Sequence, residues 1–114
     1  KKVWQACLAE MDAASLAGHF HNTYGMAIAN IYQSLEQGIR VFDSSISGLG
    51  GCPYATGASG NVSTEDLYYL LSNMGYDTGI DLDALMIASQ NISQVLQRTN
   101  PSNYANAYWQ KRCA

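Results

Sequence analysis

The sequence predicts an α/β fold, on two observations. Short apolar segments with the composition of buried strands alternate with segments in which apolar residues recur at helical spacing. A long glycine-rich stretch then separates the second strand from the helix that follows it. Alternating strands and helices at this spacing favour parallel β-α-β units. Folds of this class build their sites on the loops between strand and helix, at the carboxyl edge of the sheet.

The first predicted strand carries two histidines. Residues 2–11 have helix-forming composition, and residues 16–21 have the pattern of a buried strand that ends in a turn at residues 22–25. His19 and His21 are two positions apart near the end of that strand. Side chains at positions i and i+2 lie on the same face of a strand, so we expect both imidazoles to project together.

The next helix and strand complete one β-α-β unit. Residues 40–45 have the composition of the second strand. The helix before it is indicated by apolar residues at helical spacing and by a glycine stop. These residues are Tyr24, Ile28, Ile31 and Leu35, with Gly38 as the stop.

Residues 48–61 form the stretch around which the chain is organised. Five of its fourteen residues are Gly and one is Pro, so we expect a shaped loop that is neither helix nor regular strand. Cys52 places one thiol in its middle. Two phosphate-loop patterns are excluded, because the stretch has no Lys and because Pro53 stands where the dinucleotide pattern needs Gly.

Two helices and a C-terminal tail follow the glycine stretch. Thr64 is the expected N-cap of the first helix, and Asp81 is the expected N-cap of a second that runs to about Arg98. Apolar residues at helical spacing mark their inner faces: Leu67, Leu70, Leu71 and Met74 in the first, and Leu85, Ala88, Ile92 and Val95 in the second. Beyond Pro101 the tail carries Tyr104, Tyr108 and Trp109, which could cover an edge or meet a partner subunit, or belong to a partly ordered terminus.

Composition narrows the class of protein. A formal charge of −3 gives no general attraction to nucleic acid or to an anionic membrane. No apolar run approaches the roughly 20 residues of a membrane span. Cys7, Cys52 and Cys113 are odd in number and widely spaced, which favours free thiols in a reducing compartment over a disulfide framework.

Two parallel strands cannot close a sheet. A (β/α)8 barrel needs about 250 residues, so the 114 residues are expected to form the C-terminal portion of a TIM barrel, about its last two β/α units plus C-terminal helices. The expected division is residues 1–100 as the barrel part and residues 101–114 as a tail. We expect the isolated chain to expose the helix face at Ile28, Ile31 and Leu35.

The pattern His-x-His on a strand end, followed by a loop with Cys52 that closes on Asn61, suggests metal ligands and proton carriers. Neutral imidazole is the commonest metal ligand in proteins. Two ordinary imidazoles and a capping asparagine remain the alternative at this point.

Four segments resemble the 3-hydroxy-3-methylglutaryl-CoA lyases. They are residues 18–25 (GHFHNTYG), residues 42–45 (FDSS), residues 48–61 (GLGGCPYATGASGN) and residues 64–67 (TEDL), within a likeness that runs from about residue 16 to residue 97. The GGCPY sequence distinguishes these lyases from the isopropylmalate and homocitrate synthases, which are similar around His-x-His.

The resemblance implies a set of site residues. His19, His21 and Asn61 match metal ligands, Cys52 and His19 match catalytic positions, and Gly50, Gly51 and Pro53 match the substrate loop. It also implies a divalent cation, Mg²⁺ or Mn²⁺, a coenzyme A thioester substrate, the remainder of a barrel as partner and a homo-oligomer. Asn22 stands where many members have Asp, and the family's further metal ligand, an Asp on the first barrel strand, has no counterpart.

The implied reaction is cleavage of 3-hydroxy-3-methylglutaryl-CoA to acetoacetate and acetyl-CoA, a step of leucine degradation. The implied location is cytoplasmic in a bacterium and the mitochondrial matrix in a eukaryote. The alternatives are a Claisen-type acyltransferase of the isopropylmalate synthase kind and a catalytically inactive fragment. We expect the isolated 114-residue chain to be inactive.

Overall fold

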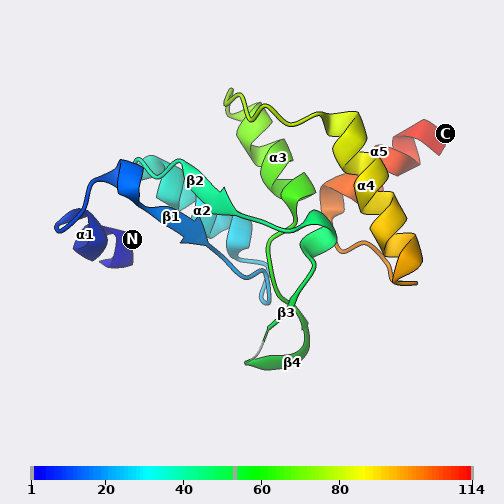
Figure 1. Ribbon diagram of the computed structural model, residues 1–114, viewed down its shortest axis with the longest axis horizontal. Coiled ribbons are helices and arrows are strands. Elements are labelled where there is room, and N and C mark those ends of the chain that lie inside the picture. The colour runs from blue at the N-terminus through cyan, green and yellow to red at the C-terminus, as the bar shows by residue number, and fades with distance from the viewer. Residues whose placement is uncertain (1, 53, 114) are drawn as a thin grey trace.

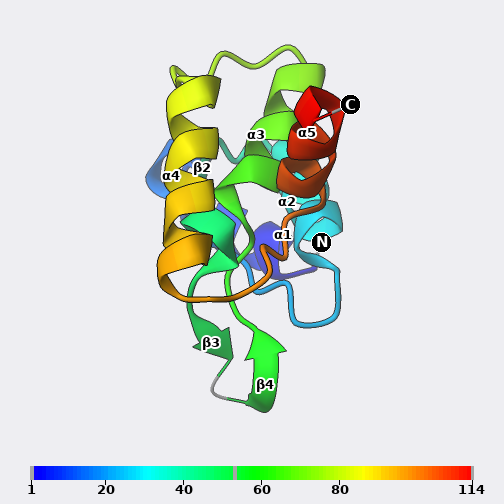
Figure 2. The same ribbon diagram turned by 90° about the vertical axis from the view of Figure 1, so that its right-hand side faces the viewer.

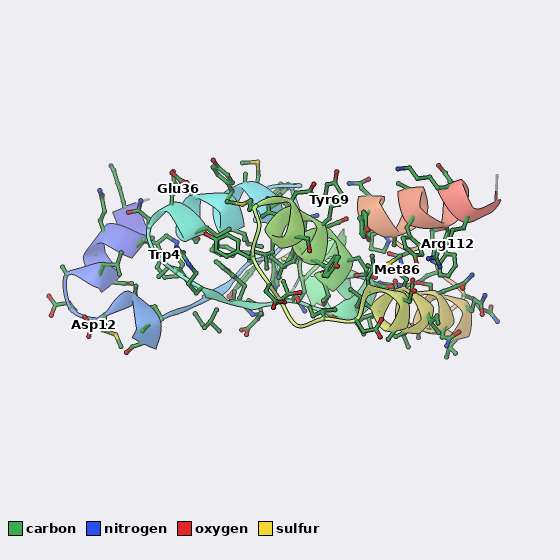
Figure 3. All side chains as sticks on the ribbon, turned by 90° about the horizontal axis from the view of Figure 1, so that it is seen from above. Trp4, Asp12, Glu36, Tyr69, Met86 and Arg112 are labelled. Atoms are coloured by element: carbon green, nitrogen blue, oxygen red, sulfur yellow. The ribbon has the colours of Figure 1, made fainter. Side chains whose placement is uncertain are left out.

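The computed structural model describes residues 2–52 and 54–113. It is a mixed α/β structure, elongated and flat, with extents of 48, 35 and 18 Å (Figure 3). Its helices are α1 (Lys2–Leu8), α2 (Ala27–Glu36), α3 (Thr64–Asn73), α4 (Leu82–Val95) and α5 (Asn103–Cys113), and its strands are β1 (Ala17–His19), β2 (Val41–Asp43), β3 (Gly51–Cys52) and β4 (Ala55–Ser59). Short 3-10 helices cover Ala13–Ser15 and Ile46–Gly48. No helix in the part of the chain that the structure describes is long and apolar enough to cross a membrane.

The predicted parallel β-α-β unit is confirmed. β1 and β2 pair in parallel, with Ala17 opposite Val41 and His19 opposite Asp43, and α2 connects them (Figure 1). Gly18 lies between the rings of Phe20 and Phe42, where a Cβ would come within 2.7 Å and 2.8 Å of them. A larger residue at position 18 would therefore displace these two rings, which pack against the core.

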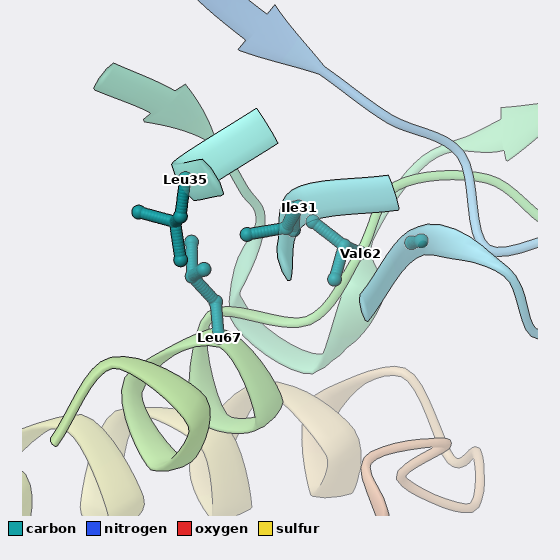
Figure 4. Close-up of a cluster of buried hydrophobic side chains, with 5 residues drawn as sticks. Ile31, Leu35, Val62 and Leu67 are labelled. Carbon is teal, nitrogen blue, oxygen red and sulfur yellow. The ribbon is translucent and has the colours of Figure 1, made fainter. Parts of the chain in front are cut away.

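The core lies between α2 and α3. Ile31 and Leu35 of α2 pack with Leu67 of α3 and with Val62, which precedes that helix (Figure 4). Ile31 is 0% exposed and Leu35 is 4% exposed, so the expectation that the isolated chain exposes this helix face is wrong. Their partners, Leu67 of α3 and Val62, belong to the same chain.

Several details of the predicted helices are also wrong. Tyr24 is 86% exposed and precedes α2 by a full turn, and Val95 at the end of α4 is 75% exposed. The cap of α3 is Ser63 rather than Thr64, because the Ser63 hydroxyl accepts a hydrogen bond from the backbone N–H of Asp66. Asp81 caps α4 as expected, accepting from Ala84 N–H at 3.0 Å.

The glycine stretch is not the irregular loop that its composition predicts. It folds into an antiparallel hairpin of β3 and β4, with a register irregularity between Gly51 and Cys52. The hairpin projects from the lower side of the molecule, away from α3 and α4 (Figure 1, Figure 2). Backbone hydrogen bonds, which glycine can make as well as any residue, stabilise the two strands despite the low strand propensity of the sequence.

The tail is a helix that packs on α3. The Asp66 carboxylate accepts hydrogen bonds from the Ser102 hydroxyl at 2.8 Å and from Tyr104 N–H at 2.9 Å. The rings of Tyr69 and Tyr104 lie 4.8 Å apart. Of the two expectations for the tail, the structure therefore favours an ordered cover on α3.

Candidate active site

Residues 60–64 join the ends of the two parallel strands. The Phe20 carbonyl accepts from Val62 N–H at 3.2 Å, and Ser45 N–H donates to the Val62 carbonyl at 3.1 Å. Isolated bridges pair His21 with Asn61 and Ser45 with Ser63. The return segment of the glycine stretch therefore runs along the carboxyl edge of the sheet, where the sequence predicts the site.

The two histidines lie together at this edge. Their ring centroids are 5.5 Å apart. Nδ1 of His19 lies 3.2 Å from Oδ2 of Asp43, its partner in the register of β1 and β2. A proton on Nδ1 satisfies this contact and leaves the Nε2 lone pair of His19 available to a ligand.

Asn61 presents an oxygen without a partner. Its Nδ2 donates to the Leu49 carbonyl at 2.8 Å, and its Oδ1 is buried with no hydrogen bond among the residues that the structure describes. Gly50, at φ +111°, allows this approach, since a Cβ there would lie 2.8 Å from the Asn61 Nδ2. A buried acceptor without a donor is costly, and a cation at Oδ1 would remove that cost.

Cys52 is a free thiol beside His21. Hydrogen bonds, first from Thr23, then from His21 and from the Tyr54 backbone, lower the pKa of Cys52 from 9.0 to about 7. A thiol with this pKa is substantially ionised at neutral pH, so it can both donate and accept a proton there.

The hairpin that carries Cys52 is closed by contact between glycines. Gly60 N–H donates to the Gly50 carbonyl at 2.9 Å, and a Cβ on Gly60 would lie 2.5 Å from that oxygen and 2.7 Å from the Gly51 carbonyl. The backbone of Gly50 and Gly51 is therefore held directly beside Asn61. Pro53, the third predicted residue of the substrate loop, lies outside the described residues.

The assembled donor set is incomplete as a metal site. Across residues 2–52 and 54–113, no three His, Cys, Asp or Glu side chains come together in a way that could hold a metal ion. His19, His21 and Asn61 supply at most two imidazole nitrogens and one amide oxygen. Asn22 adds no ligand, since its Oδ1 accepts from Ala27 N–H at 3.1 Å at the start of α2.

Sequence reasoning missed two residues at the site, Thr23 and Asp43. Thr23 is in the turn immediately after His-x-His, so its proximity to the strand end was a usable signal. Asp43 ends a strand parallel to that of His19, and equal positions at the ends of adjacent parallel strands predict a contact.

The chain has close relatives among known proteins. The profile of the HMGL-like family matches residues 2–92. A hydroxymethylglutaryl-CoA lyase of Pseudomonas mevalonii is 54% identical over 101 residues, covering 89% of this chain and 34% of that protein. The human mitochondrial hydroxymethylglutaryl-CoA lyase is 49% identical over 107 residues, covering 94% and 33%.

The chain is also similar to solved structures of hydroxymethylglutaryl-CoA lyases. The Pseudomonas aeruginosa hydroxymethylglutaryl-CoA lyase matches with a TM-score of 0.93 at 53% identity, covering 96% of this chain and 37% of that one. An HMG-CoA lyase from Acinetobacter baumannii, in complex with coenzyme A and 3-methylmalate, matches with a TM-score of 0.84 at 42% identity, covering 93% and 35%. The chain spans about a third of the length of these relatives. On the match of the family profile to most of its length, the chain belongs to the HMGL-like family.

Proposed function

We propose that this chain is the C-terminal third of a lyase that cleaves 3-hydroxy-3-methylglutaryl-CoA into acetoacetate and acetyl-CoA. The observation that carries the proposal is the edge at which His19, His21, Asn61 and Cys52 are gathered, in a chain about half identical to lyases of that name. The coenzyme A complex of the A. baumannii lyase supports a thioester substrate. The relatives described above are named as lyases, which does not favour the synthase alternative.

The barrel part of the proposal is supported by the open sheet. β1 and β2 are covered by α2 on one face, while Ala17, His19, Val41 and Asp43 on the other face are exposed. A two-stranded parallel sheet is stable in proteins when both faces are covered. The remaining strands of a (β/α)8 barrel would supply that cover, and residues 1–100 would be its final part, with residues 101–114 as the tail.

The residues present fit a divalent cation. The Asn61 Oδ1 is buried and lacks a donor, and the Nε2 lone pair of His19 is left available by the contact to Asp43. An amide oxygen with two imidazoles and a carboxylate from the missing strands suits Mg²⁺ or Mn²⁺. When bound, such an ion would act as a Lewis acid toward the oxygens of the substrate.

Cys52 is proposed to move the proton at carbon. Breaking the C2–C3 bond of the substrate converts the 3-hydroxyl carbon into the ketone carbon of acetoacetate, and the hydroxyl proton is lost to a base. The electron pair of the broken bond stays at the α-carbon of the departing thioester, which needs a proton. The Cys52 thiol is held by Thr23 and His21 on the projecting hairpin and can supply it. The hairpin would also exclude water from the reacting atoms once substrate is bound.

The reaction is tested with the complete protein and 3-hydroxy-3-methylglutaryl-CoA. We expect release of acetyl-CoA and acetoacetate, and no condensation of acetyl-CoA with a 2-oxo acid. Cys52→Ala should lower turnover by about 100-fold, in the range of a general acid or base, with Mn²⁺ binding retained. Cys7→Ala, which alters a thiol on α1, is the matched control. An equal loss of turnover in that control would contradict the role of Cys52.

The metal site is tested by His21→Ala, measured as Mn²⁺ affinity by calorimetry. Loss of one ligand should weaken binding by at least roughly 10-fold. An unchanged titration would remove His21 from the proposed ligands.

A further inference from the structure

A largely buried polar cluster lies where the chain enters the glycine stretch and meets α3 and α4. We call it the Ser47 cluster. It is centred on the 3-10 turn at Ile46–Gly48 and draws on α3, on α4 and on the connection between α4 and α5. Its members are Ser47, Glu65, Ser89, Ser93, Arg98 and Asn100.

Every polar group of Ser47 has a partner in the cluster. Its N–H donates to both carboxylate oxygens of Glu65, at 3.0 and 3.1 Å, and its carbonyl accepts from the Arg98 guanidinium. Its hydroxyl lies 3.1 Å from the hydroxyl of Ser89. Ser47 has φ 53° and ψ 26°, a left-handed conformation that non-glycine residues seldom adopt. These contacts therefore stabilise a left-handed backbone conformation that is unfavourable for an isolated serine.

The charges of the cluster act on the same residue from two sides. Glu65 is 0% exposed, and a carboxylate so buried requires hydrogen-bond donors. It receives them from Ser47 N–H and from the Ser89 hydroxyl. The Arg98 guanidinium donates a hydrogen bond to the Ser47 carbonyl. The carboxylate of Glu65 therefore binds the N–H of Ser47, and the guanidinium of Arg98 binds its carbonyl. Loss of the Glu65 carboxylate or of the Arg98 guanidinium would remove one of the contacts that hold the turn at Ser47.

The turn at Ser47 is connected to Asn61 through Leu49. Leu49 follows Ser47 by two residues, and its N–H donates to the Ile46 carbonyl at 3.1 Å as part of the turn. The Leu49 carbonyl is the acceptor for Asn61 Nδ2 at 2.8 Å. The direction of that carbonyl decides which way the amide of Asn61 faces, and hence where its unpartnered Oδ1 points.

We propose that Glu65 and Arg98 are positioning residues for the active site. They hold the left-handed turn at Ser47, and through Leu49 they orient the side-chain amide of Asn61 so that Oδ1 faces the proposed metal. The inference rests on the proposed function for the identity of the ligand at Oδ1, while the orientation of the amide can be measured without any ligand.

The first test measures Mn²⁺ affinity in the complete protein. Arg98→Met removes the guanidinium and keeps an apolar stem, and it should weaken Mn²⁺ binding by roughly 10-fold, as loss of a group that orients a ligand does. Glu65→Gln should act in the same direction. The control is Arg112→Met, which breaks a contact between α5 and Asp83 and leaves Ser47 untouched; its affinity should match that of the unaltered protein.

A double-mutant cycle separates positioning from general destabilisation. If Arg98 acts through Asn61, Arg98→Met should add no further weakening in an Asn61→Ala background. Additive losses, or an unchanged affinity in Arg98→Met, would overturn the inference. If Glu65→Gln fails to fold, the partly exposed Arg98 still carries the test.

The second test does not depend on metal. With asparagine labelled with ¹⁵N, the side-chain amide protons of Asn61 should exchange with solvent up to about 10-fold faster in Arg98→Met than in Arg112→Met, because the hydrogen bond to Leu49 is weakened. Equal exchange rates would overturn the inference. If Asn61→Ala leaves Mn²⁺ binding unchanged, the proposed metal site fails, and this exchange measurement alone decides whether Arg98 orients the amide.

Discussion

Gly60→Ala probes the contact that closes the hairpin beside the site. The new Cβ would stand 2.5 Å from the Gly50 carbonyl oxygen and 2.7 Å from that of Gly51. Both are backbone atoms, so no rotation of a side chain can relieve the overlap. The hairpin has to open, with β3 moving away from Gly60 and Asn61.

The magnitude follows from the contacts that would change. Forcing a methyl group into a closed contact costs about 1–3 kcal/mol. Opening also weakens the hydrogen bond from Gly60 N–H to the Gly50 carbonyl at 2.9 Å, worth about 0.5–1.5 kcal/mol. The lower entropy of the unfolded chain with Ala offsets about 0.4–1 kcal/mol. We expect the closed hairpin to lose about 0.5–4 kcal/mol relative to the open state.

Amide hydrogen exchange in the complete protein measures this local free energy. Gly51→Ala is the matched control, because nothing lies within 4 Å of a Cβ at that position; it should change the opening free energy by no more than about 0.5 kcal/mol. In Gly60→Ala, the amides of residues 50–61 should exchange faster than in the control. Equal exchange in the two variants would refute the inference that Gly60 is required by close backbone approach.

Three further outcomes are expected. Thr23→Val should raise the pKa of Cys52 from about 7, so that its thiolate forms at higher pH. Alkylation of Cys52 at pH 7 in metal-free protein should then slow by up to about 6-fold, since a higher pKa reduces ionisation more than it raises nucleophilicity. An unchanged rate would contradict the hydrogen bond from Thr23. Asp43→Asn removes the carboxylate beside the His19 Nδ1 and should weaken Mn²⁺ binding by roughly 10-fold, an expectation that equal calorimetric affinities would reject. The isolated 114-residue chain should self-associate in sedimentation and show no cleavage of the thioester, because the sheet face with Val41 at 54% exposure is uncovered; a monomeric, active preparation would disprove this.

Elements with strong local signals were predictable from the sequence. The apolar spacing in α2, the two strands and the Asp81 cap depend on residues close in the chain, and the structure confirms them. Ser63 and Thr64 are both hydroxyl residues, and only the geometry of the turn decides that Ser63 reaches the N–H of Asp66. The β3–β4 hairpin was missed because its strands are held by backbone pairing, for which a glycine-rich sequence gives no signal.

The site was predictable in part. The pairing of His19 with His21 follows from strand periodicity. Cys52 and Asn61 were indicated by their place in the glycine stretch, and the resemblance implied their roles. The contact of Asn61 with Leu49 spans twelve residues and could not be read from spacing. Glu65 lies in the first turn of α3, where a carboxylate suits the helix dipole, and it is fully buried against Ser47, 18 residues away. Burial of a charge depends on which distant donors surround it, and sequence periodicity carries no information about them.

His19, a proposed metal ligand, lies on the face of the sheet that this chain leaves uncovered. Its core closes between α2 and α3, whereas His19, Val41 and Asp43 lie on the open face of the sheet. In the proposed barrel, strands outside this chain would provide both an apolar cover for Val41 and the carboxylate that completes the ligands. Docking of those strands and binding of the metal would then be thermodynamically linked, since each is favoured when the other has occurred. The factor by which the docked strands strengthen Mn²⁺ binding must equal the factor by which Mn²⁺ strengthens docking. If Mn²⁺ bound the separate chain and the docked chain with equal affinity, its ligands would lie outside this interface.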